Sequence, residues 1–166
     1  MRARKRIVLV AITLATCVGC DQQTKSFAEA HLRGHASQSF FADTIRFDYV
    51  ENEGSFLGLG ESLPASWRSA LFTYACTAGI AAMLGYVLLA ARPGAIQIFS
   101  LSLICAGGIG NLLDRWINGG HVRDFLNVGI GPVRTGIFNI ADAVMMAGCV
   151  LAFLTARKSP ITSPES

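Results

Sequence analysis

One ionisable residue in this chain lies in a setting where a charge is costly. Asp142 is the single charged residue in the apolar run Thr135–Ala156. A carboxylate at the centre of a membrane-spanning helix is penalised by roughly 2.5–3.5 kcal/mol on insertion scales, so such residues usually serve a function. If the run spans a membrane, Asp142 is a candidate for the reacting group of a site.

A second carboxylate, Asp124, precedes this run in the segment His121–Phe125. When two carboxylates come within a few ångströms, the pKa of one rises and the pair shares a proton. One carboxylate then acts as general base on a water molecule, and the other as general acid toward a carbonyl or a leaving amine. Asn139 lies three residues before Asp142, hence on the same helix face, and is expected to orient Asp142 or a substrate.

Spacing alone leaves two structural interpretations of these carboxylates open. Asp142 could only hydrogen-bond a neighbouring helix, and Asp124 could only pair with Arg123 or Arg115. Whether the side chains of Asp124 and Asp142 meet depends on how the apolar stretches of the chain are arranged in space.

Other chemistries have weaker support. Three histidines, His31, His35 and His121, fall in segments predicted to lie outside the membrane, so a Ser-His-Asp arrangement is not expected. His31 and His35 have the i, i+4 spacing of metal ligands, but no third ligand accompanies them. Cys17 and Cys20 form a CxxC without a second pair. We therefore expect neither a metal nor a cofactor.

The composition predicts the elements that must position the dyad. The chain is 52% hydrophobic and 15% charged, which is not a soluble balance. A span of about 30 Å of hydrocarbon needs about 20 apolar residues. We predict an all-α membrane fold, one domain over residues 1–158 with a disordered tail at 159–166. Its four transmembrane helices are expected at about 7–28, 69–91, 94–113 and 135–156.

The first of these helices has an alternative interpretation. The basic cluster Arg2–Arg6 precedes the uncharged run Ile7–Cys20, as in a secretory signal peptide. The end of that run, Val18–Cys20, also resembles a lipidation and cleavage site of bacterial lipoproteins. However, the helical pattern continues past Cys20, and Asp21 and Lys25 have the spacing of an ion pair on one face. We favour a retained helix.

Basic flanks predict the orientation. The positive-inside rule places Arg2–Arg6, Arg92 and Arg157–Lys158 on the cytoplasmic side, together with both termini. Residues 29–66 and 114–134 then lie outside.

This topology gathers polar residues near one membrane boundary. The third helix runs outward, and the fourth runs inward with Asp142 about 10 Å below an outer end at Thr135. The residues expected to converge there are Asp21, Lys25, Asn111, Asp114, Arg115, Asp124 and Asp142.

The first outer region carries a strand pattern. Residues Ile45, Phe47 and Tyr49 alternate within Thr44–Val50, which is typical of a half-buried strand. Ser55–Leu59 would return as its partner. We therefore predict a small external β-cradle in the first outer loop.

Five short motifs, in order along nearly the whole chain, resemble those of the lipoprotein signal peptidases, also called type II or prolipoprotein signal peptidases. They are D-Q-x-[ST]-K at Asp21–Lys25, N-x-G at Asn52–Gly54, G-G-x-x-G-N-x-x-D-R at Gly107–Arg115, V-x-D-F at Val122–Phe125 and F-N-x-A-D at Phe138–Asp142.

The resemblance implies an aspartyl endopeptidase of the bacterial inner membrane, with Asp124 and Asp142 as its catalytic dyad. It implies cleavage of prolipoproteins immediately before a cysteine that carries a diacylglyceryl group, near the outer leaflet. Asp21 and Lys25 match a polar pair expected to be structural. The positions expected to bind substrate or support the dyad are Asn52, Gly54, Asn111, Arg115, Asn139 and Ala141.

One residue departs from the family pattern, and two alternative functions remain. Phe56 stands where the family usually has a small residue, so the shape of the cradle is in doubt. The alternative of another class is a non-enzymatic four-helix membrane protein, such as a small transporter or an assembly factor, in which Asp142 relays protons or binds a cation. Against a transporter, the charges form no path and the two halves do not repeat. An intramembrane protease with both aspartates inside helices fits less well, because Asp124 lies in a loop. We expect membrane lipid and prolipoproteins as partners, no nucleic acid, and a monomer.

Overall fold

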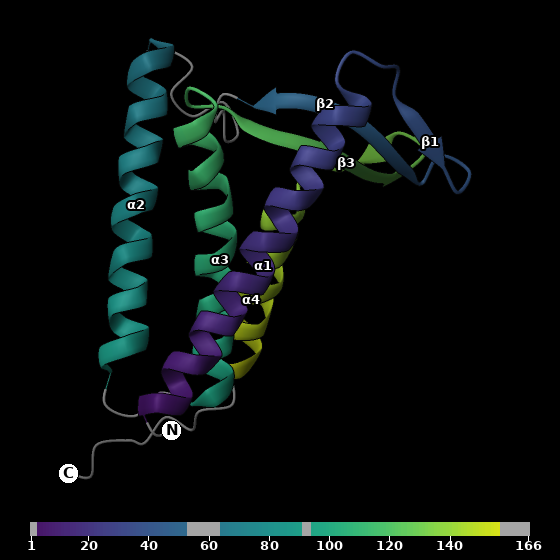
Figure 1. Cartoon of the computed structure of the whole chain (residues 1–166). Helices are drawn as coiled ribbons and strands as arrows, with labels where there is room; N and C mark the ends of the chain where they lie inside the picture. Colours follow the sequence, from purple (N-terminus) through teal and green to yellow (C-terminus); the bar gives the residue numbers. More distant parts are fainter. Residues whose placement is uncertain (1–2, 53–63, 91–93, 157–166) are drawn as a thin grey trace, which may run out of the picture.

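The computed structural model describes residues 3–52, 64–90 and 94–156 and combines helices with a small antiparallel sheet (Figure 1). The helices run side by side, and the sheet projects to one side near one end of the bundle. In chain order the elements are α1 (Ala3–Leu32), β1 (Gln38–Phe40), β2 (Ile45–Asn52), α2 (Ala65–Leu89), α3 (Ala95–Ile117), β3 (Val122–Ile130), β4 (Val133–Arg134) and α4 (Ile140–Ala156).

Helix α3 is central and packs against all three other helices. Small residues allow this close packing, because they let helix backbones approach one another. Gly107 faces the backbone and Cβ of Met145, and Gly148 of α4 faces the backbone of Ser100 and Ile104. In the same segment of α3, Gly110 faces Asp21 of α1 and Ala141 of α4, and Gly108 faces Ile80 of α2.

Helix α1 is longer than predicted and is tied to α2 at its start. It ends at Leu32, two residues before Gly34, whose φ of 76° suits a helix terminus. At the other end, the buried Arg6 donates to the carbonyl oxygens of Leu88 (2.9 Å) and Ala90 (2.8 Å). Carbonyls at a helix C-terminus lack helical partners, so Arg6 satisfies and fixes the end of α2.

The sheet has the strand order β1-β2-β3-β4. The predicted strand beginning near Thr44 is confirmed as β2, but the expectation of a cradle within the first outer region alone is wrong. Its neighbours are β1 and β3, and β3 comes from the second region, with Val50 opposite Asp124. The predicted return strand at 55–59 lies outside the described residues, as do Gly54 and Phe56, the turn at 91–93 and the tail.

Helix α4 begins at Ile140, not at Thr135 as predicted. Residues before it continue the sheet instead: the amide of Thr135 donates to Val128, and Phe138 exchanges backbone hydrogen bonds with Leu126. Asp142 consequently lies in the first turn of α4 and not about 10 Å below its end.

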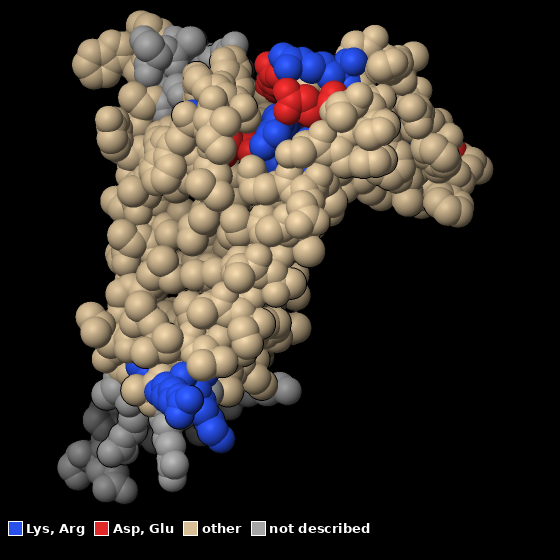
Figure 2. All heavy atoms as spheres, viewed as in Figure 1, with Lys and Arg blue, Asp and Glu red and all other residues tan. Residues whose placement is uncertain are grey.

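Surface charge divides the molecule into zones. In Figure 2 basic side chains gather at the bottom and mixed charges near the top, with an uncharged surface between them. Two helices are long and apolar enough to cross a membrane, at Ala70–Leu89 and Ala95–Ile117, and Ile140–Ala156 is apolar but shorter. Helix α1 carries Asp21 and Lys25 in its interior.

Candidate active site

The first turn of α4 holds Asp142 through a reciprocal cap. Asn139 Oδ1 accepts the amide of Asp142 at 3.0 Å, and Asp142 Oδ2 accepts the amide of Asn139 at 3.1 Å. This is the arrangement of a capping box, with Asp142 at the third helical position. The N-terminus of a helix also favours a negative charge, so the local sequence both orients Asp142 and stabilises its carboxylate.

Asn139 also holds the second carboxylate. Its Nδ2 donates to Asp124 Oδ1 at 2.6 Å, while Asn52 Nδ2 donates to Asp124 Oδ2 at 3.1 Å. Asn139 is fully buried, so its amide is fixed by these contacts. One side chain therefore joins Asp124 on β3 to Asp142 on α4.

Asn111 of α3 completes the support of Asp142. Its Nδ2 donates to Asp142 Oδ1 at 2.8 Å, and its Oδ1 accepts from Asn139 Nδ2 at 3.0 Å and from Lys25 Nζ at 2.9 Å. Asparagine amides thus supply the side-chain donors to both carboxylates.

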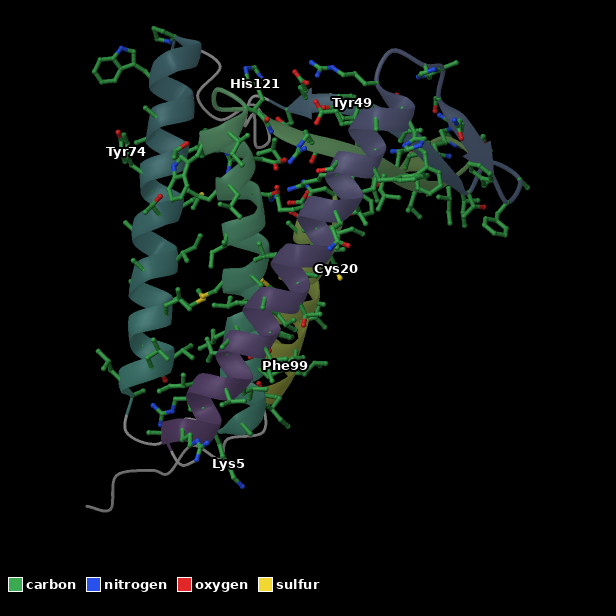
Figure 3. The ribbon with its side chains drawn as sticks, in the orientation of Figure 1. Lys5, Cys20, Tyr49, Tyr74, Phe99 and His121 are labelled. Atoms are coloured by element: carbon green, nitrogen blue, oxygen red, sulfur yellow. The ribbon has the colours of Figure 1, made fainter. Side chains whose placement is uncertain are left out.

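Two further aspartates lie nearby but are occupied by cations. Asp21 pairs with Lys25 at 2.9 Å, and Asp114 pairs with Lys25 at 3.3 Å and with Arg123 at 2.7 Å. Asp21, Lys25 and Asp114 are at most 1% exposed, so neither carboxylate can reach a substrate. In Figure 3 side-chain nitrogen and oxygen atoms gather between the upper parts of α1 and α3, above the level of Cys20.

The polar cluster bears on the alternative that Asp124 only forms an ion pair with Arg123. Arg123, its neighbour in β3, turns away and binds Asp114 and Glu29, the latter at 3.0 Å. Among the residues that the structure describes, no ion pair joins Asp124 or Asp142 to a cation. Asp21 additionally accepts the amide of Ala141 at 2.9 Å, which ties α1 to the start of α4.

Burial and charge both act on Asp124, whose side chain lies in the sheet. Loss of solvent around this residue, 3% exposed, raises the pKa of Asp124 to about 6, and the nearby Asp142 charge adds to the rise. The amides of Asn52 and Asn139 act in the opposite direction. A carboxyl group with this pKa can carry a proton near neutral pH, which suits a general acid.

The two carboxylates line one pocket of about 410 Å³. It lies between α2, α3, α4 and the start of β3, and its lining is polar near the carboxylates and apolar at Phe72 and Met145. Asp142 also borders a larger apolar groove of about 1100 Å³ along α3 and α4. The carboxylate thus stands where a polar pocket meets an apolar groove.

The structure places the predicted site residues in two groups. Asn52, Asn111 and Arg115 line the pocket with the two aspartates. Asn139 and Ala141 lie behind it and are buried, Asn139 beneath the carboxylates and Ala141 against Gly110. Arg115 Nε is buried without a hydrogen-bond partner.

Three residues of the cluster, Gln22, Glu29 and Arg123, were not predicted as site residues. Gln22 donates to Asp114 at 3.1 Å and accepts from Arg123 at 3.1 Å, and Glu29 binds Arg123. The i, i+4 spacing of Asp21, Lys25 and Glu29 on one helix face was the signal that could have identified Glu29.

The histidines and cysteines considered above lie elsewhere. His31 stacks on Phe27 at the exposed surface of α1, and Cys20 is exposed on the same helix. Among the described residues no group of three His, Cys, Asp or Glu side chains is arranged to hold a metal ion.

Solved structures share this architecture. Two structures of a bacterial membrane enzyme, each with a TM-score of 0.78, match 91% and 95% of this chain and 94% and 93% of their own chains, at 23% and 21% identity. At this identity they show the fold alone.

Sequence comparisons are more specific. A lipoprotein signal peptidase of Syntrophus aciditrophicus is 31% identical over 87% of this chain and 89% of its own length. The corresponding protein of Sulfurihydrogenibium is 31% identical over 89% of this chain and 90% of its own. The sequence pattern of signal peptidase II matches residues 13–157, which include every described residue of the pocket. The chain therefore belongs to the signal peptidase II family of proteases.

Proposed function

We propose that this protein is an aspartyl endopeptidase that removes signal peptides from prolipoproteins immediately before a diacylglyceryl-modified cysteine. The observation that carries the proposal is the pairing of Asp124 and Asp142. They share Asn139 as a hydrogen-bond partner and line one pocket, while the neighbouring Asp21 and Asp114 are bound to cations.

The unequal environments of the two aspartates suggest their roles. Asp142, at the N-terminus of α4, acts as the base that takes a proton from a water molecule in the pocket. The resulting hydroxide attacks the carbonyl carbon of the scissile peptide bond. Asp124 carries a proton and gives it to the leaving nitrogen as the C–N bond breaks. Arg115 donates to a substrate carbonyl.

A membrane location fits the distribution of charge. We place the uncharged zone of Figure 2 in the bilayer of the bacterial inner membrane, with four spanning helices and both termini in the cytoplasm. The pocket then lies near the outer leaflet. The apolar groove beside Asp142 would receive lipid chains of the substrate, each buried CH₂ contributing about 0.8 kcal/mol.

The test is cleavage by purified protein in detergent of a prolipoprotein that carries the diacylglyceryl group. Asp124→Asn and Asp142→Asn are each expected to lower the rate by about 10²–10⁴-fold, the usual contribution of a general acid or base. Asp48→Asn, a change to an aspartate in β2 outside the pocket, is the matched control and is expected to retain the rate.

Mass spectrometry of the product locates the cut. Cleavage at another bond, or equal cleavage of the precursor without its lipid, would contradict the proposed specificity. A full rate in either folded dyad variant would contradict the mechanism. If the folded protein cleaved nothing, proton transport through Asp142 would become the next function to test.

A further inference from the structure

The end of the sheet farthest from α2 carries a group of exposed apolar side chains, which we name the sheet tip. Two turns meet there: the turn between β1 and β2 contacts the hairpin of β3 and β4, because Gly129 donates its amide to Thr44 O at 2.9 Å. The members of the sheet tip are Phe40, Phe41, Ile130 and Val133, which are 44%, 77%, 80% and 78% exposed.

Backbone geometry holds Phe41 at this exposed position. Phe41, Ala42 and Asp43 have φ values of 54°, 49° and 66°, a left-handed conformation that residues other than glycine seldom adopt. The turn is held by the amide of Thr44, which donates to Phe41 O at 3.1 Å, and by Ser39, which donates to Asp43 at 2.7 Å. Costly backbone conformations that persist are concentrated at functional sites.

The charged side chains next to the sheet tip bind one another. Asp43 binds Arg46 and also accepts from Arg134, whose Nη1 lies 2.6 Å from the Asp43 carbonyl oxygen. Hydrogen bonds from Arg46 and Ser39, with the charges of both arginines, hold the pKa of Asp43 well below its usual range. Beside the exposed apolar side chains of the sheet tip, the side chain of Arg46 is 40% exposed, whereas that of Arg134 is only 13% exposed.

The position of the sheet indicates what covers these side chains. The sheet projects sideways from the bundle, and its β1 end lies lower in the view than its end over α3 (Figure 1). In Figure 2 most charge lies on the upper side, whereas the lower side of the projection continues into the uncharged flank of the helices. A bilayer that surrounds the helices would therefore reach the sheet tip.

We propose that the sheet tip is a membrane anchor, which inserts the side chains of Phe41, Ile130 and Val133 among the headgroups and upper acyl chains of the outer leaflet. The inference rests on the membrane location proposed above and assigns a partner to a different surface. Aromatic and aliphatic side chains beside arginine are typical of segments that lie in the membrane interface. The anchor would fix the height of β3, and with it Asp124, relative to the bilayer.

The test uses tryptophan fluorescence of the full chain in lipid nanodiscs. Trp67 and Trp116, the two tryptophans of the sequence, are replaced by phenylalanine, and one reporter is introduced by Phe41→Trp. Phospholipids brominated near the headgroup end of their acyl chains quench a reporter in the membrane, and iodide quenches a reporter in water. We expect the reporter at 41 to be quenched by the lipid, shifted to shorter wavelength and protected from iodide.

Three further reporters separate the possible outcomes. Ile130→Trp should behave like Phe41→Trp and guards against a folding defect in one variant. His121→Trp, on the upper side in Figure 3, should be quenched by iodide. Tyr74→Trp, at a 74% exposed position of α2, tests whether the helices lie in lipid at all.

Each quenching pattern supports or overturns the proposed anchor. Lipid quenching at 74 with iodide quenching at 41 and 130 would overturn the anchor while leaving the membrane location intact. Iodide quenching at all positions would overturn both. Protection of the reporters at positions 41 and 130 from both quenchers would indicate a protein contact, which would also overturn the proposed membrane anchor.

Discussion

Asn111 links Lys25 to Asp142 through one amide group. Its Oδ1 accepts from Lys25 Nζ at 2.9 Å, and its Nδ2 donates to Asp142 Oδ1 at 2.8 Å. An ammonium group has donors only, so Lys25, together with Asn139 Nδ2 on the same oxygen, fixes which end of the Asn111 amide faces the carboxylate. A buried lysine that touches neither the pocket nor a substrate thereby orients a group that touches the proposed base.

Lys25→Met should impair both folding and catalysis. The change leaves Asp21 and Asp114 without one cation, and breaking a buried pair typically costs about 3–5 kcal/mol of stability. In the fraction that folds, the Asn111 amide loses one of the two donors that hold its oxygen, and only Asn139 still holds it. We expect kcat to fall about 100-fold, the scale of a small misplacement at a reacting group, with KM little changed.

A double-mutant cycle separates these effects. If Lys25 acts on catalysis through Asn111, then Lys25→Met should cost little further kcat in an Asn111→Leu background, because coupled residues are not additive. Rates are normalised to the folded fraction measured by size-exclusion chromatography. Additive losses would show that Lys25 only stabilises the fold.

Stability should depend on pH through Asp124. Its pKa is raised from 3.8 to about 6 in the folded protein, so folding favours the protonated carboxyl. The stability gained is present below pH 3.8 and is lost as pH rises through about 6, an effect of about 3 kcal/mol. Asp124→Asn cannot ionise and should lack this dependence.

The measurement is the difference in Tm between Asp124→Asn and the unsubstituted protein from pH 4 to pH 8. The difference should move in favour of Asp124→Asn as pH rises, even if the new amide meets the donors of Asn52 and Asn139 poorly at every pH. A constant difference would show that the carboxyl titrates normally.

Arg123 should matter more for stability than an exposed arginine of the same sheet. Arg123→Gln removes a guanidinium that binds the buried Asp114 and the partly exposed Glu29. We expect the free energy of unfolding to fall by about 3–5 kcal/mol. Arg46→Gln breaks an exposed pair with Asp43 and should change Tm little. Equal effects in thermal unfolding would contradict the importance given to the buried cluster.

The polar residues of the site were predictable from sequence because a charge in an apolar run is exceptional. Asp142 and Asn139 were found by that signal, and the local spacing that places them on one face also forms the capping box. The position of Asp142 within its helix was predicted wrongly, since apolar residues before Ile140 extend the sheet instead of the helix. Hydrophobicity alone does not distinguish an apolar segment that extends a sheet from one that begins a helix.

Strand β3 could not be predicted from its own sequence. Val122–Ile130 contains Arg123, Asp124 and Asn127, and its side chains are buried on both faces over its first half, so no alternation marks it. Its pairing with β2 joins positions far apart in the chain, such as Glu51 and Arg123. Such contacts depend on the positions of α1 and α3, which a local pattern does not contain.

Gly107 should be essential for the position of Asp142. A Cβ at this glycine of α3 would collide with the Ala141 carbonyl oxygen and lie 2.9 Å from Met145 Cβ, so Gly107→Ala must push the start of α4 away. We expect a loss of about 1–3 kcal/mol, as for other overpacked sites. Because Ala141 precedes Asp142, the cleavage rate of the folded variant should fall as well.

Gly79→Ala is the matched control for this change. Gly79 lies in α2 with nothing within 4 Å of an added Cβ, and alanine is about 1 kcal/mol better than glycine inside a helix. The control should therefore raise Tm or leave it unchanged, and retain the cleavage rate. If both alanine variants behaved alike, contact between α3 and α4 at Gly107 would not set the geometry of the dyad, and Asn111 and Asn139 would hold Asp142 without it.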